Sequence, residues 1–260
     1  MADPGDRSIA ERVAALGRPL LVALDVDGTL APIVDDPEAA RVPETTRSLL
    51  EQLEAAGGVH VALVTGRDAA SLESLAGPLR VWRAVSHGRV VLSPGEPAKP
   101  AELSSEARTR LDAMREWAQR VAVPGGARVE EKDGAVAVHV RELAQRDPAA
   151  AEALLEQARA EAERRGLHAR LGRAVCEAEV EPGDKATALQ KLLDATGAAG
   201  VAYAGDDLTD FPAIRLATRR GGIGIFIASG ERQPPAEATD TLPGPERIPP
   251  LLEALLQALR

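Results

Sequence analysis

Short apolar runs alternate with segments of helical periodicity in the first and last parts of the chain. The runs that predict buried strands are 20–24, 59–64, 200–204 and 223–227. The segments that predict helices are 44–56, 68–76, 185–196, 210–218 and the C-terminal stretch from 249. Because neighbouring parallel strands need a crossover connection, usually a helix, this order predicts parallel pairing. The expected fold class is α/β, with a doubly wound, Rossmann-like parallel-sheet core.

The middle of the chain has a different pattern. Ser104 precedes a helical segment, and Lys132-Asp133-Gly134 is a hairpin signal between two strand-like runs. Asp147-Pro148 then begins a helix that ends at Gly166, and two short strands follow within 168–179. The order predicts a smaller α+β domain inserted into the core.

Proline-containing connections flank this insertion, and they set the expected domain boundaries. Pro94, Pro97 and Pro100 precede the insertion, and Pro182-Gly183 follows it. We therefore expect a core domain made of 1–100 and 181–260 and an α+β cap domain made of 101–180. Outside these elements, 4–18 predicts a short surface helix, and 231–246, rich in Pro and Thr, predicts a loop.

Composition narrows the classes of partner. With a net charge of −9 and only 2% aromatic residues, the chain lacks the features of nucleic-acid and anionic-membrane binders, which use basic surfaces and stacking platforms. Its single cysteine, Cys176, permits no internal disulfide, which fits a reducing compartment. Neither a signal peptide nor a membrane span is recognisable. We expect a cytoplasmic protein with a small-molecule partner and with no nucleic-acid or membrane partner. The sequence does not determine the oligomeric state.

Polar residues follow several of the predicted strands. Asp25 and Asp27 follow the first run, Thr65-Gly66-Arg67 follows the second, and an acidic stretch from Asp206 to Asp210 follows the third. The carboxyl ends of parallel strands form the reactive crevice of doubly wound sheets, so residues distant in sequence can meet there. Lys185 adds a cation at the start of the helix before the acidic stretch.

These residue types suit phosphoryl-transfer chemistry. Mg²⁺ is commonly held by one or two carboxylates, which Asp25 and Asp206 can supply, and one carboxylate can then attack phosphorus. Lys185 would screen the repulsion between the anions. Asp27 could protonate the leaving group and later deprotonate water, and Thr65 could donate to a phosphoryl oxygen.

The four segments resemble the motifs of the haloacid dehalogenase-like phosphatases. That family has an Asp-x-Asp-Gly-Thr loop, a later Ser or Thr after a strand, a Lys and an acidic Gly-Asp-Asp loop, and all four occur here in that order. The resemblance implies that Asp25 becomes an aspartyl-phosphate and that Asp27 is the general acid and base. It further implies Mg²⁺ held by Asp25, the backbone carbonyl of Asp27 and Asp206, with Asp210 and Asp207 in support.

The spacing of the motifs places the cap. The chain between Asp27 and Thr65 is too short for a domain, whereas the chain between Thr65 and Lys185 accommodates the insertion. The cap therefore lies at the family's second insertion point, where its sugar phosphatases often carry one.

Strand alternation gives the cap a polar face. In 135–141, Val136, Val138 and Val140 share one face, and His139 and Arg141 share the other. The pairs that share parity on the other cap strands are Glu130 with Lys132 and Arg173 with Glu177. Carboxylates accept hydrogen bonds from sugar hydroxyls, and Lys and Arg donate to them. This face is therefore what a hydroxyl-rich substrate would need, and the alternative is a solvated outer face of the sheet.

Longer stretches resemble the trehalose-6-phosphate phosphatase family. They are 25–34 with Asp36-Pro37, Ser86-His87-Gly88, which matches the family's short motif between the second and third of these runs, 129–132, 139–141 and 203–210. The resemblance implies a Mg²⁺-dependent phosphoric monoester hydrolase of trehalose biosynthesis. By family analogy, Glu130, Lys132, Arg173 and Glu177 would hold the distal glucose. Arg67 and His87 are further candidate substrate-binding residues.

Three departures from that family's pattern keep alternatives open. Arg173 stands where Lys is usual, Glu179-Val180 replaces Arg-Pro, and Phe211-Pro212 follows Asp210 in place of Glu-Asp. Because Lys and Arg donate in different geometries, the sugar can differ. The alternatives are another sugar phosphate, such as sucrose phosphate or mannosyl-3-phosphoglycerate, or a non-catalytic sugar-phosphate sensor.

Overall fold

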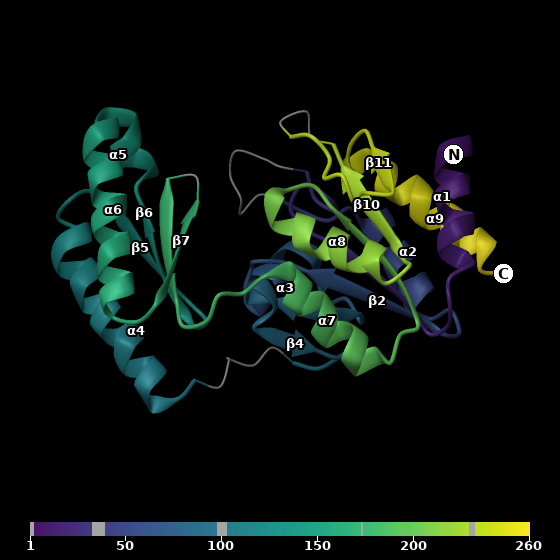
Figure 1. The fold of residues 1–260 in the computed structure, drawn as a ribbon, viewed down its shortest axis with the longest axis horizontal. Coiled ribbons are helices and arrows are strands. Elements are labelled where there is room, and N and C mark those ends of the chain that lie inside the picture. The colour runs from purple at the N-terminus through teal and green to yellow at the C-terminus, as the bar shows by residue number, and fades with distance from the viewer. Residues whose placement is uncertain (1–2, 33–39, 98–102, 173, 229–231) are drawn as a thin grey trace. The chain divides into compact units, whose positions relative to one another are not determined.

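The computed structural model describes residues 3–32, 40–97, 103–172, 174–228 and 232–260. They form two compact units (Figure 1). The core unit is Met1–Lys99 with Gly183–Arg260, and the inserted unit is Pro100–Pro182. Asp36-Pro37, Pro100 and Arg173, which the sequence analysis singles out, lie outside the described residues.

The core unit is built on one sheet, which has seven strands within the described residues, in the order β11-β10-β9-β1-β2-β3-β4. The strands are β1 (Leu20–Asp25), β2 (Val59–Val64), β3 (Trp82–Val85), β4 (Val90–Leu92), β9 (Gly200–Gly205), β10 (Ile223–Ile227) and β11 (Asp240–Leu242). In this described sheet only β4 runs antiparallel to its neighbour. The α/β fold class is therefore confirmed.

One expectation for the core is wrong. The loop predicted over 231–246 contains β11, which pairs in parallel with β10 from Ile225 to Ile227. A three-residue edge strand has too few positions to show its own alternation, and the backbone edge of β10 supplies its hydrogen bonds. A turn of 3-10 helix, Pro245–Arg247, follows it.

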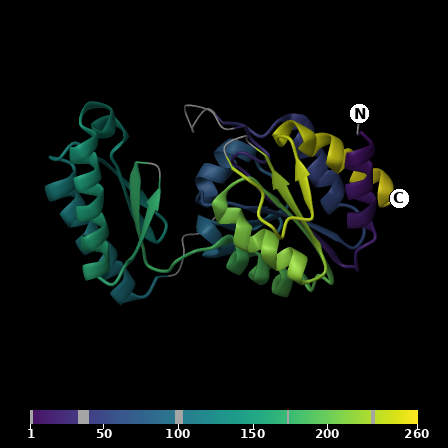
Figure 2. The ribbon, with the colours of Figure 1, turned by 45° about the horizontal axis from the view of Figure 1, so that its top comes forward.

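Helices cover both faces of the core sheet (Figure 2). They are α1 (Pro4–Ala14), α2 (Glu44–Glu54), α3 (Ala69–Ala76), α7 (Lys185–Thr196), α8 (Phe211–Arg219) and α9 (Ile248–Ala258). On one face, α7 and α8 bury Leu189 and Ile214 against Leu21 and Tyr203 of the sheet. On the other, α2 contacts β2 and α9, which also contacts α1. No helix among the described residues has the length and apolar character that a membrane span needs.

The inserted unit is a four-stranded antiparallel sheet with helices on one face. Its strands, in the order β5-β6-β8-β7, are β5 (Arg128–Lys132), β6 (Ala135–His139), β8 (Val175–Glu179) and β7 (His168–Gly172). Its helices are α4 (Ser105–Trp117), a π-helical turn (Ala118–Ala122), α5 (Arg141–Arg146) and α6 (Pro148–Arg164). Met114 and Ala158 of the helices join Val138 and Cys176 of the strands in one apolar core.

The polar strand face predicted up to residue 141 is too long. Strand β6 ends at His139, because Val140 leaves the extended conformation with a ψ of 20°. Arg141 is the first residue of α5 and is exposed. It therefore does not continue the alternation that begins at Ala135.

Candidate active site

Four ionisable side chains meet beyond the carboxyl ends of β1 and β9. Asp25 is the last residue of β1, and Asp206 follows β9 directly. Asp210 ends a 3-10 turn, Leu208–Asp210, and Lys185 is the first residue of α7. Because β1 and β9 are adjacent and parallel, their ends lie at one edge of the sheet. All four side chains are buried.

Lys185 bridges two of these carboxylates. Its Nζ donates to Oδ1 of Asp25 at 2.6 Å and to Oδ1 of Asp210 at 2.8 Å. Burial opposes the charged form of the ammonium, but the two aspartates raise the pKa of Lys185 above its ordinary value. Burial, reinforced by the charge of Asp210, raises the pKa of Asp25 well above its usual range, although Lys185 opposes the shift. The N-cap residue Asp184, which accepts from the backbone N–H of Thr187 at 2.8 Å, fixes the start of α7 and so the place of Lys185.

The donor set fits a hard divalent cation. One carboxylate oxygen each from Asp25, Asp206 and Asp210 lie within 4.8 Å of one another. Burial raises the pKa of Asp206 to about 6, and the Asp210 charge adds to the effect. Three buried carboxylates around one ammonium lack compensating positive charge, and carboxylate oxygens are the ligands that Mg²⁺ prefers.

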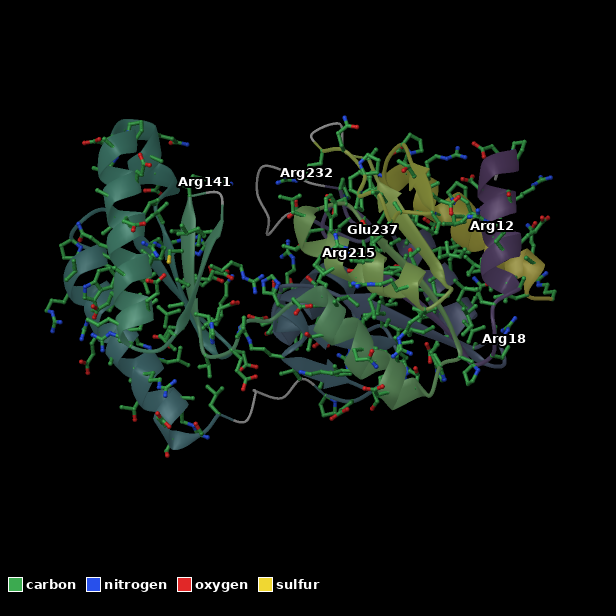
Figure 3. All side chains as sticks on the ribbon, viewed as in Figure 1. Arg12, Arg18, Arg141, Arg215, Arg232 and Glu237 are labelled. Atoms are coloured by element: carbon green, nitrogen blue, oxygen red, sulfur yellow. The ribbon has the colours of Figure 1, made fainter. Side chains whose placement is uncertain are left out.

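Asp207, the other acidic candidate, lies outside this cluster. Its carboxylate pairs with Arg232, whose Nε lies 2.6 Å from Oδ1. Arg232 belongs to the connection after β10, beside α8, where Arg215 and Glu237 also pair (Figure 3). The two neighbouring aspartates of the acidic loop thus have different surroundings.

Two glycines let the acidic side chains approach the backbone. A Cβ at Gly28 would lie 2.2 Å from Oδ2 of Asp206, and a Cβ at Gly205 would lie 2.2 Å from Cγ of Asp210. Gly28 also has a φ of +86°, which favours glycine. A larger residue at either position would therefore collide with an aspartate of the cluster, which explains why both motifs contain glycine there.

Asp27 has a different partner. Arg67 donates to both of its carboxylate oxygens, from Nε to Oδ2 at 2.8 Å and from Nη2 to Oδ1 at 2.6 Å. Hydrogen bonding to Asp27 raises the pKa of Arg67, against a smaller effect of burial. The structure thus brings together two residues that the sequence placed in separate roles.

Thr65 and His87 lie in two interlocked loops. Thr65 is buried, and its Oγ1 accepts from the backbone N–H of Arg67 at 3.1 Å. The N–H of His87 donates to the Thr65 carbonyl at 3.0 Å. A Cβ at Gly66 would lie 2.3 Å from the His87 ring, so the ring lies against that glycine. Ser86 and His87 both have positive φ, 51° and 56°, within a short turn, Ser86–Gly88.

Two further contacts of the acidic cluster are not predicted from the sequence motifs. The hydroxyl of Tyr203 donates to Oδ1 of Asp210 at 2.6 Å, and Oγ1 of Thr29 lies 3.5 Å from Oδ1 of Asp206. Tyr203 is fully buried. Tyr203 is the single tyrosine of the sequence, and it lies in a buried strand two residues before Gly205-Asp206. This position was the sequence feature that could have indicated its contact with the acidic loop.

The inserted unit carries a charged sheet face opposite its helices. Ala137 of β6 pairs across the sheet with Glu130 of β5 and Glu177 of β8. Lys132 forms an ion pair with Glu177, and Nε2 of His139 lies 2.8 Å from Oε2 of Glu130. Burial lowers the pKa of His139, although Glu130 opposes this.

Arg170, which sequence reasoning did not single out, belongs to the same face. Its Nη2 donates to Oε2 of Glu179 at 2.9 Å, across the β7–β8 pair. Glu179 is one of the departures from the family pattern noted above, and its partner comes from the neighbouring strand.

The mostly parallel α/β core, interrupted by a smaller α+β unit, shares its fold with a solved phosphatase of the haloalkanoate (HAD) enzyme superfamily from Bacteroides thetaiotaomicron, with a TM-score of 0.55 at 19% identity over 92% of this chain and 94% of that chain. The trehalose-phosphatase family model matches residues 23–241, and the chain belongs to that family. The resemblance that the motifs indicated is thereby confirmed.

Similar proteins agree with this assignment. The chain is 32% identical to a trehalose-phosphate phosphatase of Mycobacterium ulcerans, over 87% of this chain and 61% of that relative, so it spans about three-fifths of that relative's length. It is 31% identical to a probable trehalose-phosphate phosphatase of Sinorhizobium fredii, over 93% and 94% of the two chains. The solved C-terminal domain of Candida albicans trehalose-6-phosphate phosphatase shares the fold, with a TM-score of 0.74 at 20% identity and full coverage of both chains.

Proposed function

We propose that the protein is a Mg²⁺-dependent phosphoric monoester hydrolase that converts trehalose 6-phosphate to trehalose and phosphate. The observation that carries the proposal is the cluster of Asp25, Asp206, Asp210 and Lys185, in a chain of the trehalose-phosphatase family. A buried carboxylate beside an ammonium is a nucleophile whose charge is balanced before an anionic substrate arrives.

The reaction has two steps on this chain's own residues. First, Oδ of Asp25 attacks phosphorus, the bond from phosphorus to O6 of the sugar breaks, and the carboxylic acid of Asp27 gives its proton to that oxygen. An aspartyl-phosphate on Asp25 and free trehalose result. Second, water attacks the same phosphorus while Asp27 takes one of its protons, the bond from phosphorus to Asp25 breaks, and hydrogen phosphate leaves.

Asp25, Asp206 and the backbone carbonyl of Asp27, supported by Asp210, are the groups that would hold Mg²⁺. When bound, the cation would neutralise charge on the phosphoryl oxygens and on Asp25. Lys185 keeps Asp25 and Asp210 oriented through its two hydrogen bonds. Thr65, buried between the loops after β2 and β3, is the proposed donor to a phosphoryl oxygen.

The charged face of the inserted unit is the proposed sugar-binding surface, as expected of a cap. Glu130, Lys132, His139 and Glu177 present both acceptors and donors there, and the small side chain of Ala137 lies between Glu130 of β5 and Glu177 of β8. Sugar hydroxyls both donate and accept, so such a mixed face suits them better than a face of one charge. The name of the relatives, trehalose-phosphate phosphatase, supports the choice of sugar.

A substrate panel tests this function. Phosphate release would be measured with Mg²⁺ from trehalose 6-phosphate, glucose 6-phosphate, sucrose 6-phosphate and mannosyl-3-phosphoglycerate, each repeated with EDTA. EDTA-sensitive preference for trehalose 6-phosphate supports the proposal. Preference for another sugar would keep the chemistry and change the substrate, whereas no release from any of them would favour a sugar-phosphate sensor.

A further inference from the structure

Asp27 and Arg67 form a bidentate ion pair. Adjacent guanidinium nitrogens, Nε and Nη2, meet the two carboxylate oxygens at 2.8 and 2.6 Å. This parallel geometry fixes the plane of the carboxylate as well as its position, which a lysine cannot do. The side chains are 42% and 18% exposed, so the carboxylate remains open to a ligand while the arginine is largely covered.

Arg67 is itself held at several points by its own loop. Its backbone N–H donates to Oγ1 of Thr65 at 3.1 Å, and its carbonyl accepts from the N–H of Ser86 at 2.7 Å. Its Nη1 donates to Oγ of Ser71 at 3.2 Å, on the first turn of α3. A side chain that is hydrogen-bonded at its backbone and at its far end has few accessible rotamers. Arg67 can therefore hold the Asp27 carboxylate in one orientation.

We infer that Arg67 is a positioning residue for the proton-transfer group Asp27, and that it acts on the leaving-group oxygen through Asp27. The inference rests on the proposed function and differs from the sequence-based expectation that Arg67 binds substrate. Each carboxylate oxygen has a second lone pair beyond the one that accepts from Arg67. A proton can therefore reside on Asp27 while both hydrogen bonds from Arg67 remain.

Proton donation matters in proportion to the basicity of the leaving group. A sugar alkoxide is a poor leaving group without a proton, whereas p-nitrophenolate leaves without one. The value of kcat/KM reports only the steps up to phosphoryl transfer, so it isolates the first proton transfer from the later attack of water. A group that positions the acid therefore affects kcat/KM for the sugar ester far more than for the aryl ester.

The experiment compares Arg67→Gln, Asp27→Asn and the double variant on trehalose 6-phosphate and p-nitrophenyl phosphate, with Mg²⁺. For Arg67→Gln we expect kcat/KM on the sugar ester to fall roughly 10- to 100-fold, through kcat, because acid–base catalysis contributes about 10²–10⁴-fold. For the same variant on p-nitrophenyl phosphate, we expect kcat/KM to change by less than about threefold. In the Asp27→Asn background, Arg67→Gln should change the rate less than about twofold, because the two residues act as a unit.

The controls separate positioning from folding and from substrate binding. Arg12→Gln removes another arginine–carboxylate pair of the core unit, with Asp240, and should leave both substrates unaffected. Arg67→Lys keeps the charge without the two-pronged geometry, and it should show the same selective loss if Arg67→Gln does not fold. Equal losses on both substrates, or losses that add to those of Asp27→Asn, would overturn the inference and indicate substrate binding. A wild-type protein inactive on both substrates would instead overturn the proposed function, and the inference with it.

Discussion

The Nζ atom of Lys185 lies 2.6 Å from Oδ1 of Asp25, and both side chains are only 5% exposed. Replacing Lys185 with Met leaves the aspartates without their resident cation. Breaking a buried pair typically costs about 3–5 kcal/mol, so we expect a loss of that order in the unfolding free energy of the metal-free protein. We also expect kcat to fall on the order of 100-fold.

Urea unfolding and phosphate release measure the two effects. Lys191→Met is the matched control, because Lys191 is on the same helix but donates to the carbonyl of Gly88 at 2.9 Å. A Lys185→Met protein as stable and active as Lys191→Met would show that the bridge has no role.

The raised pKa of Asp206 predicts how metal-free stability depends on pH. Burial raises the pKa of folded Asp206 to about 6 from its ordinary value of 3.8, so near pH 6 the folded protein binds a proton that the unfolded chain does not. The contribution of Asp206 to stability therefore increases as pH falls from 7.5 through 6. Asp206→Asn should be more stable than wild type at pH 7.5 and should lack this part of the increase.

Thermal unfolding in EDTA between pH 5.5 and 7.5 measures the slopes. Asp194→Asn removes one charge from α7, at a residue that accepts only from Gln190 among the contacts described for it, and serves as the control. With added Mg²⁺ we expect the opposite trend, since the cation binds the ionised carboxylate. Equal slopes for the two variants in EDTA would contradict the assignment.

Asp207 and Asp210, two of the three aspartates of the acidic loop, should respond differently to the same substitution. Asp210 accepts from Lys185 and Tyr203 inside the cluster, whereas Asp207 pairs with Arg232 outside it. Asp210→Asn should lower kcat on the order of 100-fold, and Asp207→Asn by less than about threefold. The two variants control for each other in a Mg²⁺ titration of phosphate release, and equal losses would place Asp207 in the metal site as well.

The charged face of the inserted unit should affect sugar esters selectively. Lys132→Met removes a charged donor, worth about 1.5–3 kcal/mol, so we expect KM for trehalose 6-phosphate to rise roughly tenfold or more. The activity on p-nitrophenyl phosphate should not change, because that ester has no sugar. Glu131→Gln is the control: Glu131 is the neighbour on β5, its side chain has opposite parity, and it pairs with Arg115 of α4. A similar rise in KM for Glu131→Gln would count against the proposed face.

Much of the core fold could be predicted from local pattern. The buried runs of β1, β2, β9 and β10 are long enough to be recognised, and the α/β class follows from their alternation with helices. The three-residue strands β4 and β11 could not be predicted, because their pairing depends on neighbours distant in sequence. The end of β6 depends on the turn at Val140, which a continued valine alternation conceals.

The candidate site divides in the same way. That Asp25 and Asp206 lie together follows from the shared edge of two adjacent parallel strands, and Lys185 begins the helix that precedes β9. Two contacts could not be predicted, because they depend on side-chain direction in the folded loops. They are the ion pair between Asp27 and Arg67 and the hydrogen bond from the Tyr203 hydroxyl to Asp210. The roles of these residues and a cytoplasmic location stay predictions.

The most direct test of the central claim is phosphate release from trehalose 6-phosphate by the wild-type protein and by Asp25→Asn, each with Mg²⁺ and with EDTA. We expect the wild type to release phosphate with Mg²⁺ but not with EDTA, and we expect Asp25→Asn to lose at least about 10³-fold in rate, because the nucleophile is gone. Undiminished release by Asp25→Asn, or wild-type release that persists in EDTA, would contradict the central claim.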